Sequence, residues 1–129
     1  MNDTVFGKII RKEIPATIVY ENPFSLAFMD INPAAKGHVI LIPKEQYRWI
    51  EDLPDDDIAS IFITAKKLIE AMKKAYGCDL VEVHIVGEEV PHAHIHLIPR
   101  MMGDDLHGPH VKYEEGEVQQ YAEKIVSSL

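Results

Sequence analysis

Apolar residues recur at spacings of three and four between residues 54 and 76, which is the pattern of a helix with one buried face. The apolar positions of this segment are Ile58, Ile61, Phe62, Ala65, Leu68, Ile69 and Met72. Aspartates fill its first turn and lysines its last, and Gly77 follows where a left-handed cap is expected. The pattern predicts one long helix. Its aspartates are expected to interact favourably with the helix dipole rather than to bind a metal ion.

Short runs rich in Val, Ile and Leu flank this helix and predict antiparallel strands. The predicted strands cover residues 16–21, 25–31, 37–43, 79–86 and 91–99. Asn-Pro turns separate the first three, and Gly87-Glu88-Glu89 connects the last two. With a short helix near 6–11 and an amphipathic C-terminal helix near 113–127, we expect an α+β fold. In that fold the long helix packs on a five-stranded antiparallel meander sheet.

The composition narrows the class of protein. The chain has 129 residues, of which 47% are hydrophobic and 26% charged, one cysteine, and a formal net charge of −8. A chain of this length removes roughly two-thirds of its unfolded surface from water, so one domain over residues 1–129 needs no disulfide. No apolar run approaches the ~20 residues that span a bilayer, and no signal peptide is visible. We expect a cytoplasmic protein that binds neither membranes nor, given its negative charge, nucleic acid.

Three histidines, His92, His94 and His96, alternate with apolar residues inside the last predicted strand. Because successive side chains of a strand point to opposite faces, the three rings are expected on one side. The other side, expected in the core, consists of Ala93, Ile95 and Leu97. The histidine side must face something polar, since an unpartnered buried imidazole is costly.

Three interpretations of the histidine face are open at this point: a structural row, a metal site, or a catalytic site. His92 and His96 lie roughly 13 Å apart along a strand that rises about 3.3 Å per residue. A single zinc ion, which binds nitrogen at about 2.0 Å, does not easily hold all three. In the catalytic interpretation a central imidazole attacks an electrophile such as phosphorus, and flanking rings about 6.6 Å away bind its oxygens.

The pattern resembles the histidine triad (HIT) family, whose signature, His-φ-His-φ-His-φ-φ with φ apolar, is met in full at residues 92–98. Three further blocks are similar to the family, and to its Hint-like branch in particular, in the right order. They are residues 6–16 (FGKIIRKEIPA), 27–33 (AFMDINP) and 37–44 (GHVILIPK). The resemblance covers most of residues 4–100. It implies a HIT-like fold and a homodimer whose two sheets join across the interface.

The resemblance also implies a hydrolase or transferase that cleaves purine nucleoside phosphoramidates or dinucleoside polyphosphates at the α-phosphate. His94 would attack the phosphorus, and water would hydrolyse the nucleotidyl-histidine intermediate. His96 would bind the phosphate oxygens, His92 would support the central ring and the departing group, and His38 would brace the triad from a neighbouring strand. A backbone carbonyl would hold the nucleophile in the right tautomer, and no cofactor is implied.

The nucleotide itself is assigned by resemblance to an apolar base slot and an acid that binds the ribose hydroxyls. The residues implied are Phe6, Ile9, Phe28, Asp30, Ile31 and Val90. Asp30 would accept hydrogen bonds from the ribose. Plain core packing is the alternative for the apolar members. An alternative function for the whole chain is a nucleotide-binding or interaction module with negligible turnover.

Two departures from the family pattern change these expectations. The places of a structural zinc site hold Thr4, Gly7 and Gln46, so no metal is expected there. The family's Gly-Gln-Ser/Thr-Val segment before the triad carries Glu88 and Glu89 in place of its two polar residues. Unit charges 4 Å apart repel by about 1–4 kcal/mol, so we hypothesise a site that disfavours polyphosphate and tolerates a cationic amine. The alternative is that both glutamates point into solvent.

Two further histidine segments receive no assigned role. His84 lies near the place of an asparagine of the family, and that role is not transferred to it. The segment from His107 to His110 is expected to be a solvated loop, or to border the pocket of a neighbouring subunit.

Overall fold

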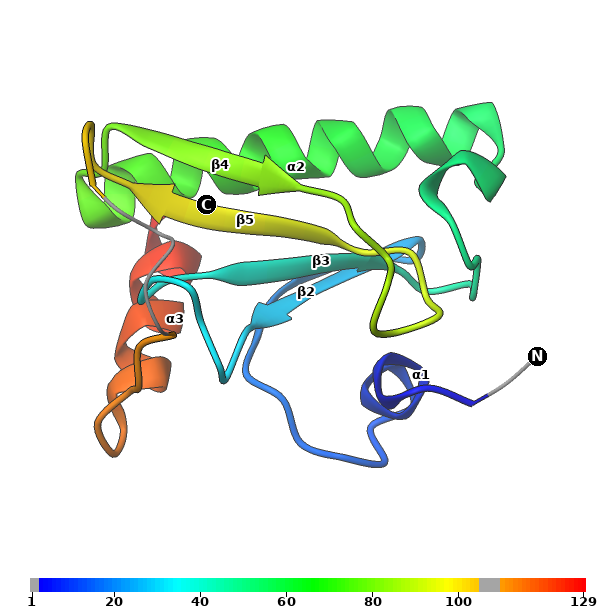
Figure 1. The fold of residues 1–129 in the computed structure, drawn as a ribbon, viewed down its shortest axis with the longest axis horizontal. Helices are drawn as coiled ribbons and strands as arrows, with labels where there is room; N and C mark the ends of the chain where they lie inside the picture. The colour runs from blue at the N-terminus through cyan, green and yellow to red at the C-terminus, as the bar shows by residue number, and fades with distance from the viewer. Residues whose placement is uncertain (1–2, 105–109) are drawn as a thin grey trace.

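The structure, a computed structural model, describes residues 3–104 and 110–129, which form one antiparallel sheet flanked by helices (Figure 1). The elements are α1 (Val5–Ile10), β1 (Ile18–Glu21), β2 (Ser25–Met29), β3 (Val39–Pro43), a 3-10 turn (Ile50–Asp52), α2 (Asp55–Tyr76), β4 (Leu80–His84), β5 (Ile95–Arg100) and α3 (Glu117–Ser128). The predicted α+β class with five antiparallel strands is confirmed. Within the described ranges, no helix combines the length and the apolarity needed to cross a bilayer.

The strand order is β1-β2-β3-β5-β4, which corrects the predicted meander for its last two strands. The chain leaves β3, runs along α2 to the far edge of the sheet as β4, and returns between β3 and β4 as β5. Burial gives the physical reason. Four of the six residues of β5 are buried and none of β4, so the more apolar strand takes the inner position and the half-exposed strand the edge.

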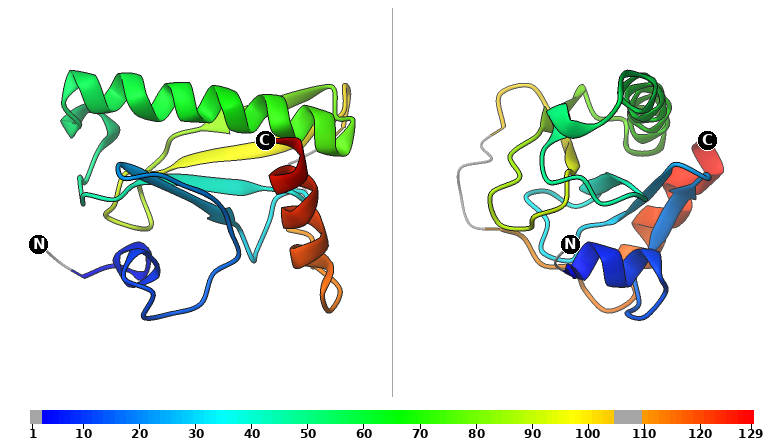
Figure 2. Two further views of the ribbon diagram at one scale, coloured as in Figure 1. Left: turned by 180° about the vertical axis from the view of Figure 1, so that it is seen from behind. Right: turned by 90° about the vertical axis from the view of Figure 1, so that its right-hand side faces the viewer.

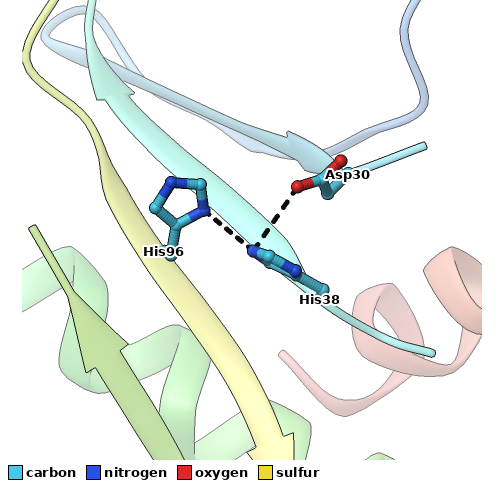
Figure 3. Close-up of side chains that lie close together, drawn as sticks. All are labelled: Asp30, His38 and His96. Atoms are coloured by element: carbon cyan, nitrogen blue, oxygen red, sulfur yellow. Dashed lines mark hydrogen bonds and ion pairs between the residues drawn. The ribbon is translucent and has the colours of Figure 1, made fainter. Parts of the chain in front are cut away.

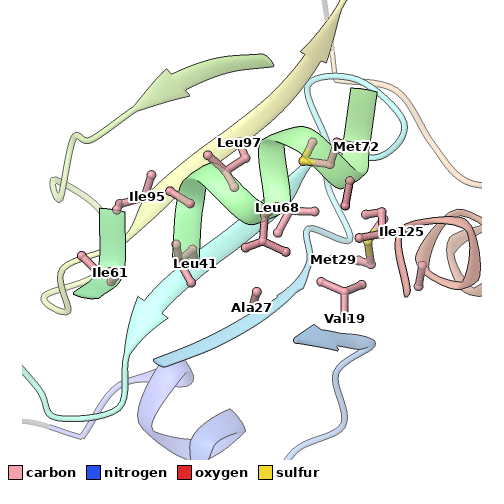
Figure 4. Close-up of a cluster of buried hydrophobic side chains, with 14 of the residues drawn as sticks. Val19, Ala27, Met29, Leu41, Ile61, Leu68, Met72, Ile95, Leu97 and Ile125 are labelled. Atoms are coloured by element: carbon pink, nitrogen blue, oxygen red, sulfur yellow. The ribbon is translucent and has the colours of Figure 1, made fainter. Parts of the chain in front are cut away.

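One face of the sheet packs against α2 and α3 (Figures 2 and 4). α2 follows Pro54 and ends at Gly77, whose φ of +65° forms the predicted left-handed cap. Its buried residues are Ile61, Thr64, Ala65, Leu68, Ala71 and Met72. Phe62, which the apolar pattern predicted to be buried, is 41% exposed and lies outside this buried stripe, which instead includes Thr64 and Ala71.

The opposite face of the sheet carries α1 and a row of side chains that changes from apolar to polar across the sheet. Phe28, Ile40, His96 and His84 are successive cross-strand neighbours on β2, β3, β5 and β4. Directly paired residues of antiparallel strands point to the same face, so these four side chains form one row across the sheet. α1 covers the Phe28 end of the row, where Phe6 packs edge to face on Phe28 with 5.6 Å between ring centroids. The histidine end lies beyond α1.

Candidate active site

A cavity of about 500 Å³ opens on this face beside α1, a volume within the roughly 300–1,000 Å³ typical of small-molecule sites. Carboxylates and imidazoles form most of its polar wall. They are Asp30, His38, Glu82, His84, Glu88, Glu89, His94, His96 and His110. The side chains come from the ends of strands and from the connections 30–38 and 85–94. Pairing of the strands brings these distant segments together, and the two-residue period of each strand sets which side chains share a face.

The triad does not form the continuous strand over residues 91–99 that was predicted. β5 begins at Ile95, and its pairing with β3 reaches only from Leu97 to Ile95, so His92 and His94 precede the ladder. The apolar side of the motif is in the core, as predicted. The histidine side is divided, because His94 and His96 line the cavity whereas the side chain of His92 is fully buried.

The backbone that carries His92 is held outside the sheet by the segment that follows β3. Pro43 ends β3 and has no N–H with which to extend the ladder. Instead the N–H of Ala93 donates to the carbonyl of Tyr47 (2.6 Å), and the side chain of Gln46 donates to the carbonyl of Pro91 (3.1 Å). These bonds replace strand pairing and turn the first triad ring away from the cavity.

The tautomer of His94 follows from the hydrogen bond between its Nδ1 and the main chain. Its Nδ1 lies 2.7 Å from the carbonyl oxygen of His92. A carbonyl only accepts, so Nδ1 carries the proton and the lone pair of the neutral ring is on Nε2. The ring of Phe6 packs on His94 edge to face, with centroids 5.0 Å apart. His94 therefore stands in the cavity wall with its orientation and its tautomer set by a backbone carbonyl.

His92 supports this arrangement from within the core. Its Nε2–H donates to the carbonyl of Pro43 (2.8 Å), and its Nδ1 is buried without a hydrogen-bond partner among the described residues. Burial lowers the pKa of His92, which keeps the ring neutral. The backbone carbonyl of His92 binds the central ring, and support of that ring by the side chain of His92 stays a prediction. Its ring, fully buried, is not in contact with the cavity, which corrects the prediction that it also meets the departing group.

His38 and His96 form a directly bonded pair next to Asp30 (Figure 3). The N–H of Ala34 donates to Nδ1 of His38 (3.0 Å), so the proton of neutral His38 is on Nε2. This Nε2 lies 2.9 Å from Nδ1 of His96 and 3.5 Å from an Oδ of Asp30. Because Nδ1 of His96 accepts, neutral His96 carries its proton on Nε2, and the ring presents a hydrogen-bond donor.

Burial keeps both members of this pair uncharged. It lowers the pKa of His38 from its usual 6.5 to about 4, against the opposing attraction of Asp30. It also lowers the pKa of His96, with the neighbouring His94 adding to the shift and the carboxylates of Asp30 and Glu89 opposing it. At neutral pH His38 and His96 therefore present donors and lone pairs at defined nitrogens rather than two imidazolium charges.

Asp30, His38 and His96 also satisfy the distances of a metal site, since one ligand atom from each lies within 4.8 Å of the others. A metal-bound histidine donates its second ring N–H to an acceptor. Here that second nitrogen, Nδ1 of His38, faces the N–H of Ala34, which is a donor. The surroundings therefore favour a proton rather than an ion at Nε2 of His38.

The positions that the resemblance assigned to a structural zinc site make local contacts in this chain. The hydroxyl of Thr4 accepts from the N–H of Gly7 (3.0 Å) and caps α1. Gln46 uses its side-chain amide to bind the backbone next to the triad. Each of these three positions thus belongs to the local structure that holds α1 and the triad segment.

Three of the six residues assigned to the nucleotide line the cavity: Phe6, Asp30 and Val90. Phe6 comes from α1, Asp30 from the residue after β2, and Val90 from the connection between β4 and β5. Asp30 accepts the N–H of Asn32 on one oxygen (2.8 Å), and its other oxygen lies towards His38.

The other three assigned residues are not part of the wall. Ile9 and Phe28 are buried behind Phe6 in a small apolar cluster, so core packing describes them better. Ile31 is 82% exposed and does not line the cavity, which corrects its assignment to the base slot. Asp30 lines the cavity, whereas Ile31 begins the bend that follows β2, where its side chain is exposed.

Two histidines of the wall were not assigned by the sequence. His84 is the cross-strand partner of His96 and lies 2.6 Å from Glu82. Its alternation with Glu82 along β4 was the available signal, but only the strand order makes it a neighbour of the triad. His110 is exposed, as expected of a loop, and it borders the cavity of its own chain, where its Nδ1 binds the carbonyl of Asn32 (2.7 Å). His107 lies outside the described residues.

The fold and the cavity define a class of proteins in which a histidine-rich pocket lies on one face of a five-stranded antiparallel sheet. The family model of the HIT domain matches residues 11–103. This chain belongs to the HIT family.

Relatives and solved structures agree with this membership. An uncharacterized HIT-like protein of Methanocaldococcus jannaschii is 43% identical over 115 residues, which cover 86% of this chain and 87% of that protein. The adenosine 5′-monophosphoramidase HNT1 of Saccharomyces cerevisiae is 40% identical over 97 residues, 74% of this chain and 61% of that protein. A crystal structure of a Hit-like protein of Bartonella henselae superposes with a TM-score of 0.90 at 34% identity, covering 100% of this chain and 98% of that one.

Proposed function

We propose that this protein is a nucleotide hydrolase that cleaves nucleoside phosphoramidates or dinucleoside polyphosphates at the α-phosphorus through a nucleotidyl-His94 intermediate. The observation that carries the proposal is the hydrogen bond from Nδ1 of His94 to the carbonyl of His92, at 2.7 Å. In the tautomer that this bond selects, the lone pair is on Nε2, and the ring lines a cavity of substrate size. The similarity to an adenosine 5′-monophosphoramidase supports the same reaction class.

The chemistry has two displacements at phosphorus. In the first, Nε2 of His94 bonds to the α-phosphorus, and the bond from phosphorus to the leaving nitrogen or oxygen breaks with its electron pair on the leaving atom. A leaving nitrogen takes up a proton from water and departs as an amine. In the second, water adds to phosphorus, the bond to His94 breaks, and the nucleoside monophosphate leaves. The Nε2–H of His96 is a fixed donor to the phosphate oxygens in both steps.

The rest of the cavity provides places for the nucleoside. We assign the base, a purine, to the apolar wall beside Phe6 and Val90, and the ribose hydroxyls to the carboxylate of Asp30. His38 acts through His96: its Nε2–H orients the second ring and fixes which nitrogen of that ring carries the proton. These roles support a nucleotide as the ligand.

We also propose that the protein is a homodimer joined through β4. This strand is at the edge of the sheet, so one row of its backbone groups has no strand partner. Val83, Ile85 and Val86, on or directly after β4, are exposed apolar side chains. Light scattering should give twice the chain mass of 14.6 kDa, and Val83→Lys should shift the protein towards the monomer.

Intact-mass measurement of the protein after rapid quenching, without acid, tests the covalent step. With an adenosine phosphoramidate we expect an adenylate adduct on the wild type and none on His94→Ala, together with release of amine only by the wild type. Tight nucleotide binding with neither adduct nor product would instead identify a binding module. Stoichiometric zinc lost on mutation of His94 or His96 would contradict the proposal in favour of a metal site.

A further inference from the structure

The connection between β4 and β5 brings two carboxylates into the wall of the cavity, those of Glu88 and Glu89. Two contacts fix its backbone. Gly87, at φ +76°, lies so close to Trp49 that an added Cβ would be 3.2 Å from the indole ring. Beyond the glutamates, the carbonyl of Val90 accepts the N–H of His92 (2.8 Å). Both glutamates are exposed residues that border the cavity, and the segment that carries them is joined at both ends to the structure around the triad.

The charges of this wall are unbalanced. Glu82 is paired with Arg100 (2.8 Å) and lies 2.6 Å from His84, so its charge is offset. Within residues 3–104 and 110–129, Glu88 and Glu89 form no ion pair with any cationic side chain. The described wall contains no lysine or arginine, and its histidines His38 and His96 are held neutral by burial.

A polyphosphate leaving group would bring several negative charges against this described wall without a lysine or arginine to receive them. Like charges at a binding surface disfavour a ligand, and a complementary charge favours it. A leaving amine that carries a second, protonated amino group would instead place that cation against the free carboxylates. The wall therefore discriminates between leaving groups by the sign of their charge.

We propose that Glu88 and Glu89 form a leaving-group subsite that selects phosphoramidates whose amine bears an additional positive charge. The inference rests on the proposed function, because it uses cleavage of the P–N bond by His94 as its readout. Its chemistry adds no new step. Nε2 of His94 bonds to phosphorus, the P–N bond breaks, the nitrogen takes a proton from water, and a diamine rather than a simple amine leaves the subsite.

Two adenosine phosphoramidates of equal length test this proposal, one made from n-hexylamine and one from hexanediamine, with diadenosine tetraphosphate as the anionic leaving group. The readout is the ratio of kcat/KM for the cationic to the neutral amide within each variant. For the wild type we expect a ratio of about three to ten, the size of one or two solvent-exposed ion pairs. In Glu88→Gln/Glu89→Gln the ratio should fall to about one, and cleavage of the tetraphosphate relative to the neutral amide should rise by roughly the same factor.

Glu70→Gln is the matched control, because it removes one carboxylate from an exposed position of α2 that does not line this cavity. Its ratio should equal that of the wild type. Raising the salt concentration should lower the wild-type ratio and leave that of the double variant unchanged, since screening acts on exposed charges. A wild-type ratio of one, or a ratio that the double variant keeps, overturns the subsite. Failure of the wild type to cleave even the neutral amide overturns the proposed function instead.

Discussion

The two halves of the triad motif are held in different ways, although their sequence pattern is uniform. His96 lies on β5 in register with β3, and it is bonded through its side chain to His38 of the neighbouring segment. His92 and His94 precede the ladder and are held by backbone carbonyls, those of Pro43 and His92. The sheet half fixes a proton on a ring by side-chain pairing, and the other half fixes it by the main chain.

The difference teaches what each half can do. A ring bonded to another ring, such as His96, has its donor nitrogen set by a partner that itself must stay neutral. A ring bonded to a carbonyl, such as His94, has no such dependence, because a carbonyl accepts at every pH near neutrality. The first arrangement suits a hydrogen-bond donor to phosphate oxygens, and the second suits a nucleophile.

The largest expected effect separates these two roles directly. His94→Ala should lower kcat/KM for an adenosine phosphoramidate by about 10⁴-fold or more and abolish the adduct, since it removes the nucleophile. His96→Gln keeps a donor near the same place and should cost only about 10²-fold, with the adduct still formed. Steady-state kinetics and intact mass measure both variants. Equal losses in the two, with no adduct in either, would contradict the division of roles.

Most of the fold could be predicted, because period and spacing are local, whereas the roles of the cavity residues came from the family resemblance and stay predictions. The pattern of α2, its cap at Gly77 and the apolar side of the triad depend on neighbours within a few residues. The strand order could not be predicted, because the pattern identifies strands and leaves open which of β4 and β5 takes the edge. In the structure β5, which is mostly buried, takes the inner position, and β4, which is partly exposed, takes the edge.

The corrections at the site have the same origin. Alternation along residues 92–98 predicts three equivalent rings. The pairing of β3 with β5 nevertheless stops before it reaches His92, because Pro43, far away in the sequence, ends β3. Ile31 follows a cavity residue and is apolar, as expected of a residue that contacts a nucleotide base. Its side chain is exposed, because its direction is set by the turn after β2. His110 reaches the cavity through a segment without periodicity.

The second expected effect is a loss of stability on acidification, and it comes from His38, the partner of His96 in the half of the triad that lies on the sheet. Unfolded His38 binds a proton with a pKa near 6.5, whereas folded His38 does so only near 4. Its contribution to stability is therefore present above pH 6.5 and is lost as the pH falls from there towards 4, by about 2 kcal/mol at pH 5. His38→Asn keeps an acceptor for the N–H of Ala34 but does not titrate. Urea unfolding at pH 7.5 and 5 should show a shallower acid limb for this variant, and parallel curves would refute the prediction.

The third effect concerns the segment beside the carbonyl-held half. Gly87→Ala forces a side chain into a left-handed conformation and within 3.2 Å of the ring of Trp49, and it should cost roughly 1.5 kcal/mol. Gly103→Ala is the control, because Gly103 also has a positive φ, +81°, and no atom near its Cβ position. Thermal unfolding should place Gly87→Ala below Gly103→Ala, and only Gly87→Ala should lower kcat/KM. Equal behaviour of the two would mean that the contact with Trp49 does not position the connection.

The smallest effect tests how the sheet half is anchored from outside the sheet. Gly37, the residue before His38, donates its N–H to the hydroxyl of Tyr113 (2.8 Å). Tyr113→Phe removes this acceptor and leaves the part-buried N–H without a partner. We expect a loss of about 1 kcal/mol in unfolding free energy and less than a threefold loss in kcat/KM. Tyr47→Phe, which removes only an exposed bond to Glu45, should cost less. Indistinguishable stabilities of the two variants would show that β3 and β5 hold His38 in place without help from the segment that leads into α3.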